Sequence, residues 1–208
     1  MVTNSKIFII NGKPTAGKDT FVSYVTEEAK DEFEVLNVST VDKVKEAAVI
    51  LGWNGIKTDS ARLFLSELKD LSSKFFDGPA KYCYSVASSL KDNQILFIHC
   101  REPEEIDKMK KMLDCFTIYI DRTLEGQTTS NHADAEVTNY KYDYVIDNNS
   151  SLDDLRERAK MFLTIVKDQE KFWIDSKSLK CLIDKVFIKI SNPTNSAYTE
   201  CKAHQRLS

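Results

Sequence analysis

The sequence lacks any long hydrophobic run. Its apolar stretches are short, and none approaches the roughly 18 residues that a membrane-spanning helix requires. The first ten residues, MVTNSKIFII, contain too short an apolar run to act as a signal peptide. We therefore expect no membrane association and a cytoplasmic location.

An excess of basic charge is also absent. The 208 residues carry 29 Lys and Arg against 32 Asp and Glu, mixed along the chain, for a formal charge of −3. Proteins that bind nucleic acid usually concentrate basic residues on a face or in a tail. Nucleic acid is therefore not expected as a partner. At 42% hydrophobic and 29% charged residues, the chain is long enough for one core and a small appendage.

Closely spaced cysteine pairs are missing as well. The five cysteines are Cys83, Cys100, Cys115, Cys181 and Cys201. Two of them lie in apolar, strand-like stretches, which favours reduced thiols over disulfides. Cys181, Cys201 and His204 supply three ligands where structural zinc takes four, so a zinc site is not expected.

The sequence does contain an alternation of strand-like and helix-like segments. Five nearly continuous apolar runs lie at residues 6–10, 34–38, 95–99, 116–120 and 142–146. Such runs are typical of strands that are buried on both faces. Helical patterns lie at residues 18–30, 42–51, 60–75, 78–91, 103–113 and 151–166. The alternation predicts an α/β fold, a three-layer sandwich with a five-stranded parallel sheet.

The helical and strand patterns weaken after Val166. The remaining segment contains an apolar helix-like stretch, a candidate strand at residues 186–190 and the polar turn SNPTNS. We therefore divide the chain into a domain over residues 1–167 and a small C-terminal extension over residues 168–208. The extension is expected to dock on the domain or on a partner, and its role is open.

One segment, KIFIINGKPTAGKDTF at residues 6–21, places Gly-x-x-x-x-Gly-Lys between a predicted strand and a predicted helix. The glycines let backbone N–H groups point into one concavity, and the helix N-terminus adds partial positive charge. Lys18 supplies a full charge to the β and γ phosphates of a nucleotide. The pattern predicts a phosphate-binding loop formed by Gly12, Lys13, Pro14, Thr15, Ala16, Gly17, Lys18, Asp19 and Thr20.

Position 19 departs from the usual form of this loop. A Ser or Thr normally follows the lysine and coordinates Mg²⁺ through its hydroxyl. Asp19 stands there in this chain, and a carboxylate is a hard oxygen ligand that suits Mg²⁺, directly or through water. We therefore predict ATP and Mg²⁺ as cofactors, Asp19 as the metal ligand, and Thr20 as a contact to the α phosphate.

The Gly-Lys-Asp loop resembles that of the P-loop nucleoside and nucleotide kinase superfamily. Within this superfamily it resembles the branch of deoxynucleoside monophosphate kinases and phosphomevalonate kinases. Three further segments resemble the same branch: VSTVDKVKEAAVILGW, KTDSARLFLSELKDL and LFIHCREPEEIDKM. The region from TTSNHADAEV to NNSSLDDL resembles its lid and last strand. Together the resemblance covers about residues 6–166.

This resemblance implies transfer of a phosphoryl group from ATP to a phosphate-bearing acceptor, a (deoxy)nucleoside monophosphate. It implies that Asp42, Lys45, Arg62 and Arg101 hold the acceptor. Arg122 follows the fourth strand, and the carboxyl ends of parallel strands meet at one crevice. The candidate catalytic cations are therefore Lys18, Arg101 and Arg122. The expected partner is a small-molecule nucleotide, and a homodimer is left open.

Two features depart from the resemblance. Relatives carry an acid at the end of the third strand, where this chain has His99 and Cys100, and residues 123–140 contain no Lys or Arg. Both favour an alternative, a catalytically weak nucleotide-binding module that reports ATP occupancy to a partner. A regulatory GTPase is disfavoured, because the Asp-x-x-Gly and Asn-Lys-x-Asp motifs are missing. Trp53 and Phe64 are interpreted as core residues, with stacking on a base as the alternative.

Overall fold

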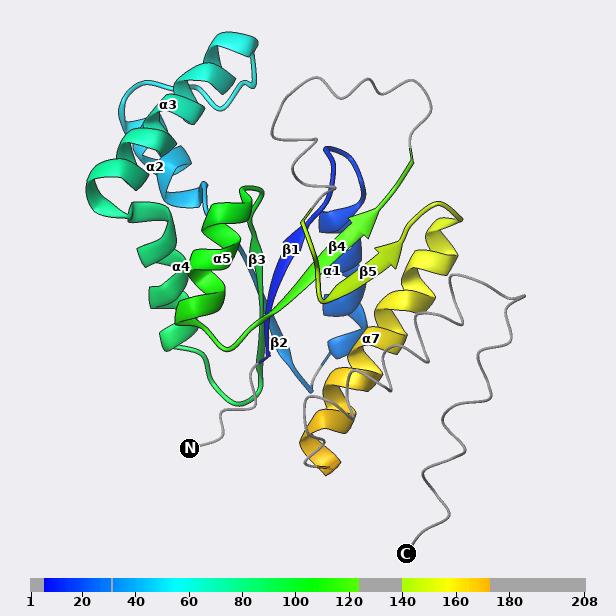
Figure 1. Ribbon diagram of the computed structural model, residues 1–208. Coiled ribbons are helices and arrows are strands. Elements are labelled where there is room, and N and C mark those ends of the chain that lie inside the picture. Colours follow the sequence, from blue (N-terminus) through cyan, green and yellow to red (C-terminus); the bar gives the residue numbers. More distant parts are fainter. Residues whose placement is uncertain (1–5, 31, 124–139, 173–208) are drawn as a thin grey trace, which may run out of the picture.

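The computed structural model describes residues 6–30, 32–123 and 140–172 (Figure 1). The strands are β1 (Ile7–Asn11), β2 (Glu34–Ser39), β3 (Gln94–His99), β4 (Phe116–Asp121) and β5 (Tyr144–Asp147). The helices are α1 (Lys18–Ala29), α2 (Asp42–Ile50), α3 (Asp59–Phe76), α4 (Gly78–Ser88), α5 (Pro103–Met112) and α7 (Leu152–Phe172). All strand pairs are parallel, in the order β2-β3-β1-β4-β5, which confirms the predicted α/β fold with a five-stranded parallel sheet.

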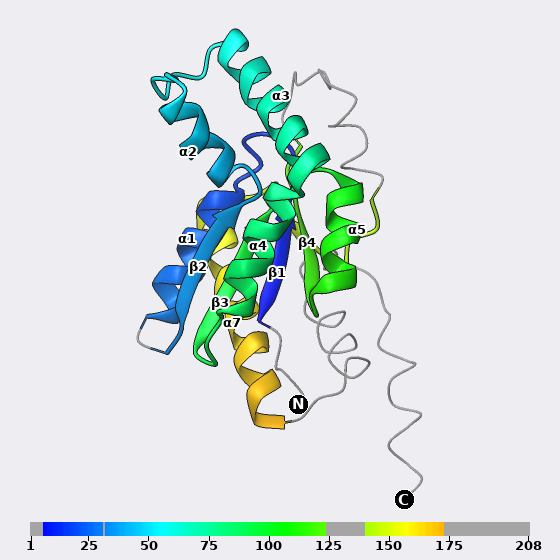
Figure 2. The same cartoon turned by 90° about the vertical axis from the view of Figure 1, so that its left-hand side faces the viewer.

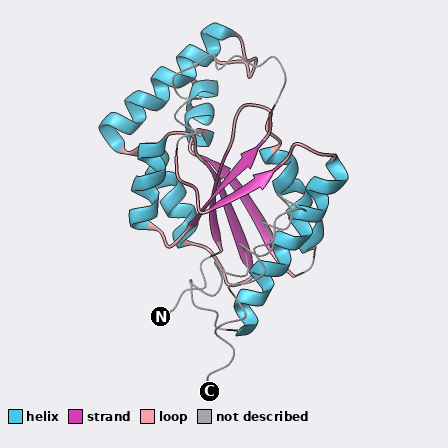
Figure 3. Ribbon diagram, turned by 45° about the vertical axis from the view of Figure 1, so that its right-hand side comes forward, coloured by secondary structure: helices cyan, strands magenta, loops and turns pink. Residues whose placement is uncertain are grey.

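The sheet lies between two helical layers, as Figure 3 shows. Side chains of the central strand alternate between them, because successive residues of a strand point to opposite faces. Phe8 and Ile10 pack with α1 and α7, whereas Ile7 and Ile9 pack with α4 and α5. Burial on both faces is the reason that the strands read as continuous apolar runs.

Phenylalanines fill the layer between the sheet and α7. Phe162 of α7 lies edge-on to Phe8, with ring centroids 4.9 Å apart, and edge-on to Phe21 of α1 at 5.6 Å. The edge-to-face arrangement places the positive edge of one ring on the negative face of another. This cluster fixes α1, and with it the loop before α1, against the sheet.

Helices α2 and α3 do not cover the sheet. They project beyond α4, pack against each other, and both contact α4 (Figures 1 and 2). Thr58 caps α3, since its hydroxyl accepts a hydrogen bond of 3.2 Å from the N–H of Ala61. This projecting pair carries part of the predicted acceptor site.

Helix α7 begins within one residue of its predicted start, but its end differs from the prediction. The Ser151 hydroxyl accepts from the N–H of Asp154 at 3.1 Å, while the Asp154 carboxylate accepts from the N–H of Ser151 at 3.1 Å. The predicted end at Val166 is wrong, because α7 continues to Phe172. The domain boundary drawn after residue 167 therefore falls within α7. Residues 173–208, including the candidate strand at 186–190, lie outside the described residues.

None of the helices in the described parts of the chain combines the length and the apolar character needed to cross a bilayer.

Candidate functional site

The loop between β1 and α1 requires glycine at two positions. Gly12 and Gly17 have φ angles of 150° and 94°. A Cβ atom added to Gly12 would lie 2.7 Å from the carbonyl oxygen of Ile120, and one added to Gly17 would lie 2.4 Å from the Asn148 Nδ2 atom. Any other residue would therefore be strained in its backbone and would clash with its neighbours.

Lys18 is held against this loop by the loop's own carbonyl groups. Its Nζ atom donates hydrogen bonds of 2.6 Å to the Gly12 oxygen and 2.8 Å to the Lys13 oxygen. Lys18 is also the first residue of α1, where partial positive charge from the helix accumulates. The ammonium group and the helix terminus thus reinforce each other as an anion-binding element.

Two asparagines that were not predicted as site residues fix the loop in place. Asn148, buried after β5, donates from Nδ2 to the Ala16 oxygen at 2.7 Å. Asn11, buried at the end of β1, accepts from the N–H of Gly12 at 2.8 Å and donates to the Arg101 oxygen at 3.1 Å. These bonds therefore tie the loop conformation to the segments that follow β1, β3 and β5.

The predicted site residues follow different strands but lie at one edge of the sheet. The phosphate loop follows β1, Asp42 follows β2, Arg101 follows β3, and Arg122 follows β4 (Figure 1). Because all strands run parallel, these four positions meet at the carboxyl edge, where ligands bind in open α/β sheets.

Asp42 and Lys45 form a pair in the first turn of α2. The Asp42 carboxylate accepts a 2.7 Å hydrogen bond from the N–H of Ser39, and its other oxygen lies 3.4 Å from Lys45 Nζ. The bond to Ser39 ties the start of α2 to the end of β2, and Lys45 retains hydrogen-bonding capacity for an anion.

His99 occupies the centre of these groups. It ends β3 with a side chain only 15% exposed, and its Nε2 atom lies 3.6 Å from the Asp19 Oδ1 atom. Burial lowers the pKa of His99 below its ordinary value, Asp19 and Asp42 act to raise that pKa, and Lys18 and Lys45 act to lower it. Residues of the phosphate loop and of the acceptor segment therefore lie close enough to one imidazole to influence its charge.

The three candidate arginines differ from the groups around His99. Arg62 in α3 and Arg101 after β3 have exposed side chains, and Arg122 is half-buried. Within the described residues, no hydrogen bond or ion pair joins their guanidinium groups to one another or to Lys18. The structure thus places them at or beyond the carboxyl edge without assembling them into a cluster.

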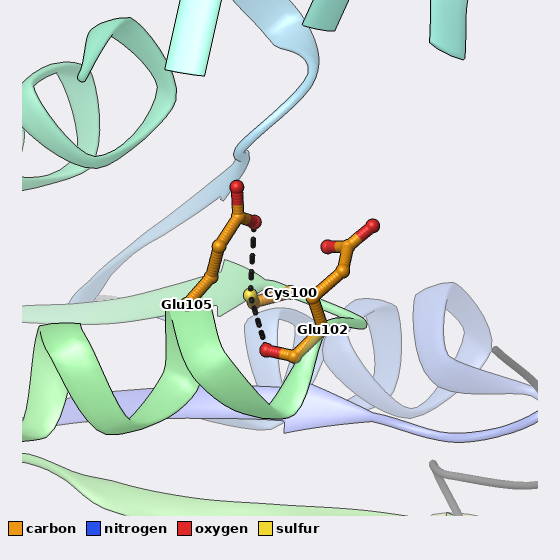
Figure 4. A group of neighbouring side chains, drawn as sticks. All are labelled: Cys100, Glu102 and Glu105. Carbon is orange, nitrogen blue, oxygen red and sulfur yellow. Dashed lines mark hydrogen bonds between the residues drawn. The ribbon is translucent and has the colours of Figure 1, made fainter. Parts of the chain in front are cut away.

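A cleft of about 1070 Å³ lies away from the phosphate loop and is lined by α3, α4, α5 and Tyr140. Its buried Lys69 has Nζ 2.5 Å from a Glu102 carboxylate oxygen and 3.0 Å from a Glu105 carboxylate oxygen. Burial raises the pKa of the Cys100 thiol well above its ordinary value, and this protonated thiol donates to the Glu105 carboxylate at 3.6 Å (Figure 4). Lys69 therefore supplies the cation here, and the cluster ties α3 to α5.

Trp53 and Phe64 do not belong to the core, so that interpretation is wrong. Phe64 is 36% exposed, Trp53 is half-buried, and both line a hollow of about 380 Å³ where α2 leads into α3. The reason is the position of α2 and α3, which lie beyond the sheet, where no second layer from the described residues covers them.

The chain thus combines a parallel sheet in the order β2-β3-β1-β4-β5 with a glycine-rich loop and a lysine between its first strand and its first helix. Among solved structures, the chain is similar to a cysteine-to-alanine variant of APS kinase from Mycobacterium tuberculosis, at 11% identity and a TM-score of 0.46 over 78% of this chain and 97% of that one. It is also similar to shikimate kinase from Aquifex aeolicus, at 12% identity and a TM-score of 0.47 over 80% of this chain and 98% of that one. No family model and no curated protein matches the chain.

Proposed function

We propose that this chain is a phosphotransferase that moves the γ-phosphoryl group of ATP to a (deoxy)nucleoside monophosphate. One observation carries the proposal: Lys18 and Asp19 follow β1, Asp42 and Lys45 follow β2, and both pairs lie at the carboxyl edge of the sheet on either side of β3, which ends at His99. Ligands bound at these neighbouring strand ends would lie in one crevice, as direct transfer between them requires.

The loop would bind the β and γ phosphates with its backbone N–H groups and the Lys18 ammonium. Lys18 would exchange its bonds to the Gly12 and Lys13 oxygens for bonds to phosphate oxygens. Because hydrogen bonds to Asn11 and Asn148 hold the loop in place, little reorganisation of its backbone would be needed. Charge stabilisation of this preorganised kind supplies most of the rate in phosphoryl transfer.

On the acceptor side, Lys45 and the exposed guanidinium groups of Arg62 and Arg101 would contact the acceptor phosphate. The acceptor phosphate is already an anion at neutral pH, so its oxygen can attack without a protein base. Asp19, whose carboxylate is 90% exposed, fits a divalent cation, which when bound offsets the negative charge of the phosphates.

A second candidate function is a nucleotide-binding module without transfer activity. It is favoured by one observation, that the side chain nearest Asp19 at the end of β3 is an imidazole and not a carboxylate. Such a module would bind ATP as tightly as a kinase does, so binding alone does not separate the two functions.

The test is a coupled assay with ATP, a divalent cation and a panel of nucleoside and deoxynucleoside monophosphates. We expect Lys18→Ala to lower kcat/KM by about 100- to 1000-fold, the loss typical of one preorganised electrostatic group. The matched control is Lys91→Ala, an exposed lysine at the opposite edge of the sheet, which should leave turnover unchanged. Turnover that survives Lys18→Ala would contradict the proposal. Tight ATP binding without turnover on any acceptor would support the nucleotide-binding module instead.

A further inference from the structure

The Nε2 atom of His99 is buried and has no hydrogen-bond partner within the described residues. A buried polar atom without a partner costs about 1–3 kcal/mol, so nearly all such atoms in folded proteins are satisfied. The nearest acid, Asp19, does not satisfy it, because 3.6 Å exceeds the length of a hydrogen bond. The nitrogen therefore faces a carboxylate across a gap that neither group closes.

That gap fits a shared cation. Two ligand atoms that lie about 2.1–2.2 Å from one metal ion and subtend about 110° are about 3.5 Å apart. The separation of Nε2 and Oδ1, 3.6 Å, matches this value. The Asp19 carboxylate is 90% exposed and can adjust, whereas the imidazole is fixed at the end of β3.

Other cationic groups nearby do not fill this gap. The Lys18 ammonium is bonded to the Gly12 and Lys13 oxygens, and Lys45 lies 3.4 Å from Asp42. Around Cys100, by contrast, Lys69 already neutralises the carboxylates, so that cluster has no comparable need for a metal ion.

We propose that His99 Nε2 and Asp19 together form a mixed nitrogen and oxygen site that binds a divalent transition-metal ion in preference to Mg²⁺, next to the nucleotide phosphates. Mg²⁺ binds oxygen ligands almost exclusively, whereas imidazole is a good ligand for the divalent ions from iron to zinc. The inference rests on the proposed function, because the nucleotide phosphates complete the coordination of the ion.

The experiment uses the full chain with ADP and Mn²⁺, the latter as a paramagnetic probe, and pulsed electron paramagnetic resonance to detect nitrogen coupled to the metal. We expect ¹⁴N coupling that changes to the ¹⁵N pattern when the protein is made with ¹⁵N-histidine. His99→Asn should abolish the histidine signal, and the matched control His204→Asn should retain it. In competition between Co²⁺ and Mg²⁺, His99→Asp should shift the affinity ratio toward Mg²⁺ by at least about 10-fold, because an oxygen ligand then replaces the imidazole nitrogen.

The outcomes separate this inference from the function on which it rests. If ADP and Mn²⁺ bind together but no histidine nitrogen couples to the metal, the mixed site is refuted and the phosphotransferase stands. If the metal couples to a histidine that persists in His99→Asn, the assignment to His99 is wrong. If the chain binds no nucleotide with any divalent ion, both the inference and the proposed function fail.

Discussion

Replacement of Lys69 by methionine isolates the contribution of one buried cation to the fold. The Lys69 side chain is 9% exposed and neutralises two carboxylates, that of Glu102 at the N-cap of α5 and that of Glu105 in its first turn. Methionine fills a similar volume without charge. Lys69→Met therefore leaves the packing of α3 nearly intact but removes the partner of both acids.

Glu102 and Glu105 contribute unequally to the loss of stability that we expect in Lys69→Met. Removing one partner of a buried ion pair costs about 3–5 kcal/mol. The Glu105 side chain is 19% exposed and remains poorly solvated in the variant, whereas Glu102 is 46% exposed and is screened by water. We expect the free energy of unfolding to fall by about 2–3 kcal/mol, since the cost arises chiefly at Glu105. For a chain of this size, that loss lowers Tm by about 4–12 °C.

A mutation of Lys69 isolates the contribution of these ion pairs to stability better than a pH titration does. Burial acts to raise the pKa of Glu102, but the hydrogen bond and the charge of Lys69 outweigh burial, so the pKa of Glu102 is lowered. The stability that Glu102 contributes is therefore lost as the pH falls through its folded pKa. Burial raises the pKa of Glu105, so the stability linked to Glu105 is lost as pH rises through its folded pKa. The two effects have opposite signs and partly cancel.

Urea unfolding followed by circular dichroism measures the loss, with Lys74→Met as a matched control on the exposed side of α3. Adding Glu105→Gln to Lys69→Met should recover at least half of the lost stability, because no isolated charge then stays buried. A Lys69→Met variant as stable as Lys74→Met would refute the reasoning, since it would mean that water already reaches these carboxylates.

Two further predictions follow from the loop and from the thiols. Gly17→Ala should destabilise the protein by about 1–3 kcal/mol more than Gly55→Ala, because both glycines have positive φ but only at Gly17 does the added Cβ meet a neighbour, Asn148; equal melting temperatures would contradict the close approach. In a Cys115→Ser, Cys181→Ser, Cys201→Ser background, Cys83 and Cys100 should react with a thiol reagent at pH 8 only as fast as the protein opens, since both are buried and burial raises the pKa of Cys83 to about 12. Immediate labelling of the native protein would contradict that burial.

The features that could be predicted from the sequence are those that depend on neighbouring residues. A strand such as β3, QILFIH, is recognisable because both faces are buried, and the phosphate loop is recognisable because its glycines and lysine keep a fixed spacing. The end of α7 was missed for a related reason. Apolar periodicity weakens after Val166, but the following residues, KDQEK, favour helix and include neither glycine nor proline, so the helix continues.

Contacts between distant segments could not be predicted in this way. Lys69 reads as one more solvated charge on α3, and nothing near it in the sequence indicates that residues 102 and 105 will bury it. The bond between Asn148 and the Ala16 oxygen joins residues 132 positions apart. The exposed position of Phe64 likewise depends on where α3 lies relative to the sheet, which its own periodicity does not specify.

His99 is unusual both in the sequence and in the structure. In the sequence it is the departure from the resemblance, a histidine where an acid was expected; in the structure it carries a buried nitrogen without a partner. The four residues before it, ILFI, are fully buried and apolar, and an apolar residue at position 99 would extend the strand without an unsatisfied atom. Locally unfavourable choices of this kind are expected at functional sites, where a ligand supplies the missing interaction. The energetic cost of the imidazole is thus an argument that position 99 binds something, and the facing carboxylate of Asp19 indicates that the ligand is a cation.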